Sequence, residues 1–141
     1  MIKVAVLGAK GRMGAETVKT VLAQSDLSLV AQLDLGDSLD LIKGADVVVD
    51  FTHPDSVMKN LEFAISNGIS VVVGTTGFND EKLSQVKSWL AKQPKVGALI
   101  APNFGLGAVL MMQFAAQAAK HFERSEEHTS ELQSPYVISY A

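Results

Sequence analysis

The feature that most constrains the fold of this 141-residue chain is a regular alternation of short apolar runs with longer amphipathic stretches. The first run, residues 4–7, is apolar at every position and ends at a glycine, which is typical of a strand buried on both faces. The stretch that follows, residues 11–24, repeats apolar residues three to five positions apart, as an amphipathic helix does. These apolar residues are Met13, Val18, Val21 and Leu22.

The alternation continues along the chain and predicts five strands and four helices. The strands are expected at residues 4–7, 29–33, 47–51, 71–73 and 96–101. The helices are expected at residues 11–24, 54–67, 79–93 and 106–122, the last apolar enough to be buried. Because this order implies right-handed crossovers between parallel strands, we predict an α/β fold, a Rossmann-type doubly wound parallel sheet.

Composition excludes several classes of function. The formal net charge is −3, and no basic stripe is present, so neither a nucleic acid nor a membrane is expected as a partner. The chain has no cysteine, which agrees with a cytoplasmic location and excludes disulfides and thiolate metal sites. No apolar run is long enough for a signal sequence or a membrane span. No metal-ligand spacing and no nucleophile motif is found, so no metal and no catalytic residue is predicted.

The loop after the first strand is a candidate phosphate-binding site. Residues 8–14 form a G-x-x-G-x-x-G pattern that opens the first helix, where glycines allow a tight turn and close backbone approach to a pyrophosphate. Two of its side chains are cationic. The same pattern is also typical of a plain tight turn. The candidate cofactor-binding residues here are Gly8, Ala9, Lys10, Gly11, Arg12 and Met13.

Asp34 ends the second strand about 20 residues after the glycine loop, where an acid is expected to bind an adenosine ribose hydroxyl. By itself Asp34 would be a solvated strand-end carboxylate, but the loop and the acid in this order favour dinucleotide binding. The acid favours NADH, because it would repel a 2′-phosphate. Lys10 and Arg12 offset that repulsion, so the cofactor is predicted only as NADH or NADPH.

Three further loops follow the later strands, and in a parallel sheet they are expected at the same edge as the glycine loop. Residues 74–77 place two hydroxyls between two glycines, and residues 101–105 offer an amide and an aromatic ring. Each loop is also compatible with an ordinary turn. The remaining candidate cofactor-binding residues are Phe51, Thr52, Gly74, Thr75, Thr76, Ala101, Pro102, Asn103 and Phe104.

Four of these segments in this order resemble the 4-hydroxy-tetrahydrodipicolinate reductase family, and Asp34 with its neighbours resembles the actinobacterial branch. The segments are VLGAKGRMG, DFTHP, VVGTTGF and IAPNF. The resemblance covers about residues 1–123 and departs at Gly105, where the family usually has serine. It implies an NADH- or NADPH-dependent step of the diaminopimelate route to lysine, in which a cyclic dicarboxylate is reduced.

The resemblance also implies what lies outside this chain. In the family, the substrate-binding and catalytic residues belong to a second domain, and the enzyme assembles mainly through that domain as a homo-oligomer, a tetramer. No residue here matches them. We therefore expect residues 1–123 to form the dinucleotide-binding domain of the reductase, inactive without the C-terminal catalytic domain.

Residues 124–134, RSEEHTSELQS, resemble the translation of a sequencing-library adapter, so residues 124–141 are expected to be a non-native tail.

Two alternative interpretations of the function of the chain are kept. A genuine tail would favour a stand-alone NAD(P)-sensing module without catalysis. Another amino-acid-pathway dehydrogenase would share the first domain but not the Gly-Thr-Thr-Gly and Ala-Pro-Asn-Phe segments.

Overall fold

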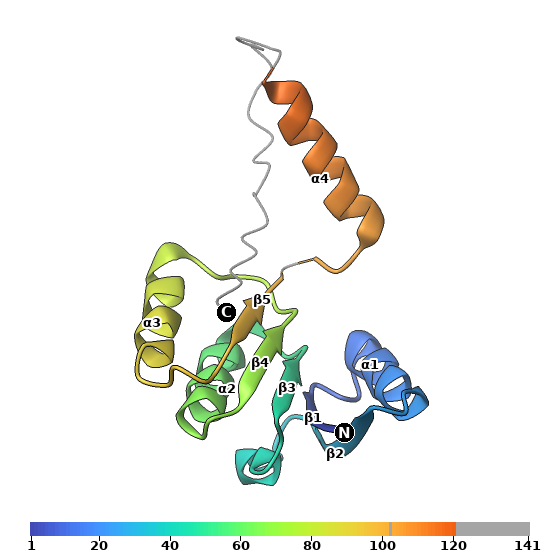
Figure 1. Cartoon of the computed structure of the whole chain (residues 1–141), viewed down its shortest axis with the longest axis vertical. Coiled ribbons are helices and arrows are strands. Elements are labelled where there is room, and N and C mark those ends of the chain that lie inside the picture. Colours follow the sequence, from blue (N-terminus) through green and yellow to red (C-terminus); the bar gives the residue numbers. More distant parts are fainter. Residues whose placement is uncertain (102, 121–141) are drawn as a thin grey trace.

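The computed structural model describes residues 1–101 and 103–120. Within them, parallel strands form one sheet in the order β2-β1-β3-β4-β5 (Figure 1). The strands are β1 (Ile2–Leu7), β2 (Leu27–Leu33), β3 (Val47–Asp50), β4 (Ser70–Val73) and β5 (Ala98–Ile100). The helices are α1 (Arg12–Ala23), α2 (Pro54–Ser66), α3 (Asp80–Leu90) and α4 (Leu106–Ala119), with a 3-10 helix, η1 (Leu39–Ile42). The predicted α/β parallel sheet is confirmed.

Helices cover the sheet from both sides, as Figure 1 shows for α1 on one side and α2 with α3 on the other. Val4 and Val6 of β1 pack with Val21 of α1. The alternate residues of β1, Ala5 and Leu7, belong to the larger core that includes α2 and α3. Successive side chains of a strand point to opposite faces, which explains why every position from 4 to 7 is apolar. The sheet is doubly wound.

The order of the strands creates a switch point between β1 and β3. From β1 the chain crosses to β2 at one edge, and then returns past β1 to add β3 on its other side. Because all pairings are parallel, the loops after β1, β2 and β3 leave the sheet at the same edge. The loops on the two sides of a switch point diverge and leave a crevice, where doubly wound sheets bind ligands.

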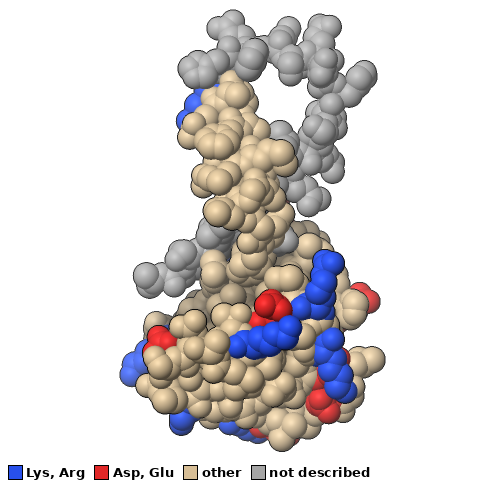
Figure 2. Space-filling model, turned by 90° about the vertical axis from the view of Figure 1, so that its right-hand side faces the viewer, with Lys and Arg blue, Asp and Glu red and all other residues tan. Residues whose placement is uncertain are grey.

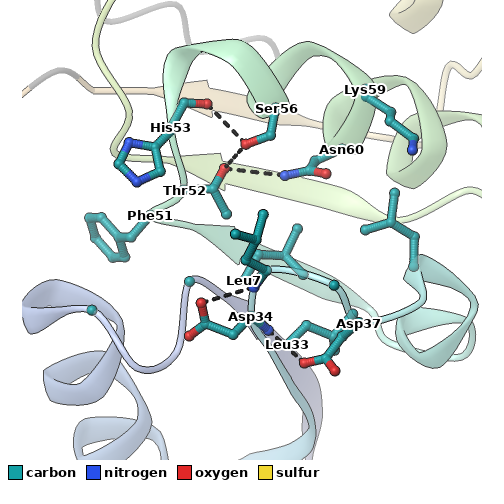
Figure 3. Close-up of a pocket in the computed structure, with 15 residues that line it drawn as sticks. Leu7, Leu33, Asp34, Asp37, Phe51, Thr52, His53, Ser56, Lys59 and Asn60 are labelled. Atoms are coloured by element: carbon teal, nitrogen blue, oxygen red, sulfur yellow. Dashed lines mark hydrogen bonds between the residues drawn. The ribbon is translucent and has the colours of Figure 1, made fainter.

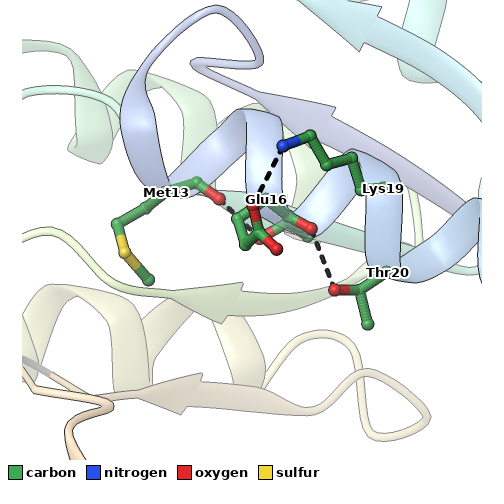
Figure 4. A network of polar contacts seen from close by, with 5 residues as sticks. Met13, Glu16, Lys19 and Thr20 are labelled. Atoms are coloured by element: carbon green, nitrogen blue, oxygen red, sulfur yellow. Dashed lines mark hydrogen bonds and ion pairs between the residues drawn. The ribbon is translucent and has the colours of Figure 1, made fainter.

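The burial of residues along helix α1 differs in part from the apolar pattern that predicted the helix. Its buried residues are Gly14 and Val21, whereas Met13 is 45% and Leu22 67% exposed, so two of the four apolar residues that predicted the helix lie outside its buried stripe. Gly14 and Val21 are seven residues apart and face the sheet, and Met13 and Leu22 each lie one position away from one of them. The outer surface of α1 carries a Glu16–Lys19 ion pair of 3.3 Å and threonine hydroxyls that donate to carbonyls one turn back (Figure 4).

Helix α4 is the largest departure from prediction. It was expected to be buried, but none of its residues is buried, and Leu106, Met111 and Phe114 are 73%, 68% and 63% exposed. Figure 2 shows it as an uncharged column that projects from the sheet domain. An apolar sequence predicts that a helix needs a covering surface, but it does not identify that surface. Among the described residues, no helix has both the length and the apolar character of a membrane span.

Candidate functional site

A pocket of about 410 Å³ opens at the carboxyl ends of β1, β2 and β3, which is the edge where the switch point lies (Figure 3). Its walls come from the ends of these strands, the loop after β2 and the first two turns of α2. The lining residues are Leu7, Gly8, Gly11, Leu33, Asp34, Leu35, Gly36, Asp37, Leu39, Phe51, Thr52, His53, Ser56, Lys59 and Asn60. The lining therefore combines apolar side chains, mainly leucines, with carboxylate, hydroxyl, amide and ammonium groups.

Glycine lets the backbone of three elements come into contact beside the pocket. Gly8 has φ +73°, and a Cβ there would lie 2.7 Å from the carbonyl oxygen of Phe51. A Cβ at Gly14 would collide with the carbonyl oxygen of Gly8, so only glycine lets α1 approach the loop this closely. No side chain caps the start of α1 at Gly11. The first-turn N–H groups of α1 are thus not used by a cap, which suits an anion.

Asp34 is fixed as an ionised acceptor at the rim of the pocket. Its carboxylate accepts from the backbone N–H of Lys10 at 2.8 Å and from that of Leu35 at 2.9 Å. The N–H groups of Leu35 and Lys10 hold the pKa of Asp34 below its usual value of 3.8. Each oxygen makes one of these bonds, and a carboxylate offers about four acceptor positions. Acceptor capacity is therefore left for two vicinal hydroxyls, and the bond to Lys10 joins Asp34 to the glycine loop.

Two further loops approach the pocket from the β3–β4 side. The hydroxyl of Thr75, which is 4% exposed, donates to the carbonyl of Thr52 at 3.1 Å. The rings of Phe51 and Phe104 form an edge-to-face pair with centroids 5.8 Å apart. A Cβ on Gly74 would collide with the ring of Phe51 and lie 3.0 Å from that of Phe104. The loops after β3, β4 and β5 therefore meet at the same edge.

The structure brings most of the predicted site residues to this edge. Gly8, Gly11, Asp34, Phe51 and Thr52 line the pocket. Lys10, Gly74, Thr75 and Phe104 contact them through the bonds and ring contacts above.

Other predicted residues lie at the edge but do not line the pocket. Ala9 donates its N–H to the Leu33 carbonyl at 3.1 Å, and Ala101 is half-buried and donates to Val73. The exposed residues are Arg12, Met13, Thr76 and Asn103. Asn103 accepts from the Gly105 N–H at 2.7 Å, so its side-chain oxygen holds its own loop. Pro102 lies outside the described residues, as does the predicted tail, residues 124–141.

Sequence reasoning missed the contribution of α2 and of the loop after β2. Ser56, Lys59 and Asn60 reach the pocket from α2, and Asp37 faces them from the other side (Figure 3). Their positions at spacings of three and four along a helix could have marked one face, but nothing in the sequence identifies which face of α2 meets the pocket. Asp37 accepts from the Asp34 N–H at 2.8 Å, so it also holds in place the residue that is predicted to bind the ribose.

Comparison with known proteins gives a consistent result. A family described as "Dihydrodipicolinate reductase, N-terminus" matches residues 2–104. A 4-hydroxy-tetrahydrodipicolinate reductase from Corynebacterium efficiens is 56% identical over 140 residues, covering 95% of this chain and 56% of the relative. One from Mycolicibacterium gilvum is 58% identical over 127 residues, covering 89% and 52%. The chain spans about half the length of the curated relatives it matches.

Solved structures agree with the fold. A dipicolinate-bound dihydrodipicolinate reductase from a Paenisporosarcina species is 38% identical with a TM-score of 0.74, covering 86% of this chain and 55% of that one. A scyllo-inositol dehydrogenase from Lactobacillus casei with bound NAD(H) has a TM-score of 0.63 at 14% identity, which shows a shared fold alone.

Proposed function

The chain belongs to the dihydrodipicolinate reductase family, whose N-terminal part it matches over residues 2–104, and from this premise we propose that its pocket edge binds NADH or NADPH. The observation that carries the proposal is that Asp34 and the glycine loop meet at the switch point, joined by the bond from the Lys10 N–H. In this arrangement the uncapped start of α1 holds the pyrophosphate, and Asp34 holds the adenosine ribose.

The described residues fit such a cofactor. Gly8 and Gly14 keep the loop close to β3 and α1, because a Cβ on either residue would collide with backbone atoms. The pocket beside Asp34 has apolar lining residues that include Leu33 and Leu39, which suits an adenine ring. In this proposal, the loops at residues 74–77 and 101–105 face the nicotinamide end. When bound, the nicotinamide supplies a hydride, and the role of this chain is to bind and orient the nicotinamide ring.

For the complete protein we propose the reaction named for its relatives, the reduction of 4-hydroxy-tetrahydrodipicolinate to tetrahydrodipicolinate in lysine and diaminopimelate biosynthesis. We propose further that it works in the cytoplasm as a homo-oligomer. Holding a dicarboxylate substrate requires cationic groups, and the reduction requires a proton donor. Neither is assigned within residues 1–123. The 141-residue chain alone is therefore proposed to bind nucleotide without catalysing the reaction, and residues 1–123 to be the binding domain.

Between the two cofactors, we propose that NADH binds more tightly. Asp34 is held ionised by two N–H groups, and Asp37 adds a second carboxylate at the same rim. Both would repel the 2′-phosphate of NADPH. Lys10 and Arg12 are exposed and belong to the glycine loop, so they reduce the difference in affinity without reversing it.

Calorimetric titration of the chain with NADH tests the proposal against a matched control. Asp34→Asn should lower the affinity about tenfold to a hundredfold, because hydrogen bonds to a charged group contribute about 1.5–3 kcal/mol. Asp46→Asn is the control: Asp46 also accepts from a backbone N–H, that of Lys3 at 2.7 Å, but it precedes β3 at the opposite edge. Equal affinities for NADH in wild type and Asp34→Asn would contradict the proposed site.

Two measurements extend the test. A chain ended at residue 123 should bind NADH as tightly as the full chain, if residues 124–141 are a tail without function. Substrate-dependent oxidation of NADH by the 141-residue chain should be absent, and measurable turnover would refute the assignment of catalysis to residues outside it.

A further inference from the structure

One buried carboxylate beneath the pocket is not used by the proposed cofactor contacts. Asp50 ends β3, the central strand beside the switch point, and is 2% exposed. Its side chain points to the sheet face covered by α2. A buried carboxylate is unfavourable unless hydrogen bonds replace its hydration. Its oxygens have three such bonds.

The three donors to Asp50 come from two elements. One oxygen accepts from both the backbone N–H and the hydroxyl of Thr52, at 2.8 Å and 2.6 Å. The other oxygen accepts from the side-chain amide of Asn60 on α2, at 2.9 Å. The bond from residue 50 to the N–H two positions later is an Asx-turn, which bends the chain as it leaves the strand. Asp50 thus fixes the direction in which the loop after β3 leaves the sheet.

This bend determines the position of two carbonyl groups in the site. The carbonyl of Phe51 lies next to Gly8, where even one Cβ atom would not fit. The carbonyl of Thr52 accepts the hydroxyl of Thr75 from the loop after β4. The backbone carbonyl of Asp50 also accepts from the Gly74 N–H, at 2.9 Å. Asp50 is therefore linked to three loops at the pocket edge. It bonds directly to the loop after β3, accepts from Gly74 in the loop after β4, and approaches the glycine loop through the Phe51 carbonyl beside Gly8.

Thr52 connects Asp50 to the pocket surface. Its hydroxyl donates to Asp50 and accepts from Asn60 and Ser56, both at 3.2 Å, so its hydrogen-bonding capacity is used within the protein. Thr52, Ser56 and Asn60 all line the pocket, whereas Asp50 does not. The carboxylate is therefore placed to act on a ligand only through its neighbours.

We propose that Asp50 is a positioning residue for the dinucleotide: its buried carboxylate orients Thr52, which lines the pocket, and through Thr52 the loop after β4 that carries Thr75. This inference rests on the proposed function, because it specifies how tightly the same site binds NADH. A purely structural role predicts loss of stability alone. A positioning role predicts loss of affinity that passes through Thr52.

The test is a double-mutant cycle on the full 141-residue chain, with NADH affinity measured by calorimetry and the unfolding midpoint by circular dichroism. Asp50→Asn replaces one acceptor by a donor and should lower NADH affinity about tenfold. Thr52→Val should lower it to a similar extent. The double variant should bind no more weakly than the weaker single variant, because both changes break the same link.

Ser70→Ala is the matched control. Ser70 is half-buried, begins β4 at the opposite edge, and accepts the Gly97 N–H at 3.2 Å. Its loss should lower the unfolding midpoint and leave NADH affinity unchanged. If Asp50→Asn does not fold, Asn60→Ala gives a milder form of the test, since it removes one donor to Asp50, and should weaken binding about threefold.

The outcomes separate the two proposals. Wild-type affinity in Asp50→Asn, or in Asn60→Ala where that variant is used, would overturn the positioning role and leave the proposed cofactor site intact. Losses that multiply in the double variant would overturn the route through Thr52. A wild-type chain that binds no NADH would overturn the proposed function and this inference together.

Discussion

Replacing Gly14 by alanine tests the close packing on which the site depends. In an open helix, glycine to alanine is favourable by up to about 1 kcal/mol, because alanine has the higher helix propensity. At Gly14, however, the added Cβ would lie 2.7 Å from the Gly8 carbonyl carbon and 2.9 Å from the Ala9 Cα, where ordinary contacts begin at 3.4 Å. Its collision with the Gly8 oxygen is closer still. All three atoms are backbone, so no side chain can rotate away.

The magnitude follows from these distances. The closest collision, with the Gly8 oxygen, requires α1 and the loop to separate by about 1 Å or more. Overpacking costs about 1–3 kcal/mol, and because every clashing atom belongs to the backbone we take the upper part of that range, about 2–3 kcal/mol. After the gain in helix propensity, we expect Gly14→Ala to lower the free energy of unfolding by about 1–2 kcal/mol. The midpoint of thermal unfolding would fall by about 4–8 °C. NADH affinity should also fall, because the amides of the glycine loop move with the Gly8 carbonyl.

Gly107 provides the control. It is the second residue of α4, it has no positive φ, and a Cβ there would meet nothing within 4 Å. Gly107→Ala should therefore be neutral or stabilising by about 0.5 kcal/mol and should leave NADH affinity unchanged. Thermal unfolding and calorimetry of the two variants give the comparison. If Gly14→Ala is as stable as Gly107→Ala, the packing of α1 against the loop is looser than described, and the reasoning is refuted.

Two further predictions concern Asp34 and α4. The pKa of Asp34 is lower in the folded chain than its usual 3.8, so its contribution to stability is complete above about pH 5 and is lost as pH falls through the folded value. The difference in unfolding midpoint between wild type and Asp34→Asn should accordingly shrink as pH falls below 3.8 and vanish once the folded carboxylate is protonated; a difference that stays constant as pH falls would contradict this assignment. In α4, Phe114→Ala should change the free energy of unfolding by less than about 0.5 kcal/mol, whereas Leu61→Ala in the core should lower it by about 2–5 kcal/mol. A loss above about 1 kcal/mol at Phe114 would show that α4 is packed.

The fold was predictable because its determinants are local. Each strand is a short, largely apolar run, and a glycine or an acid directly follows β1, β2 and β4. The alternation of strand and helix then limits the sheet to parallel topologies. The convergence of the strand ends follows from parallel pairing alone, and the structure confirms it through the bonds from Lys10 to Asp34 and from Thr75 to Thr52.

What could not be predicted depends on contacts between distant residues. The link between Asp50 and Asn60 joins a strand end to the second turn of a helix, and neither residue belongs to a motif that names its partner. The burial of α4 was predicted from composition, but composition does not specify a neighbour. Met13 belongs to the apolar pattern that predicted α1, but the contact between Gly14 and the glycine loop sets the rotation of α1 and leaves Met13 exposed.

The most direct test of the central claim is to map the chemical shifts of backbone amides while NADH is added to the ¹⁵N-labelled chain. If NADH binds at the switch point, the largest changes will occur at the carboxyl edge of the sheet, at Gly8, Gly11, Asp34, Thr52 and Thr75. Changes centred on the opposite edge, or no changes at saturating NADH, would contradict it.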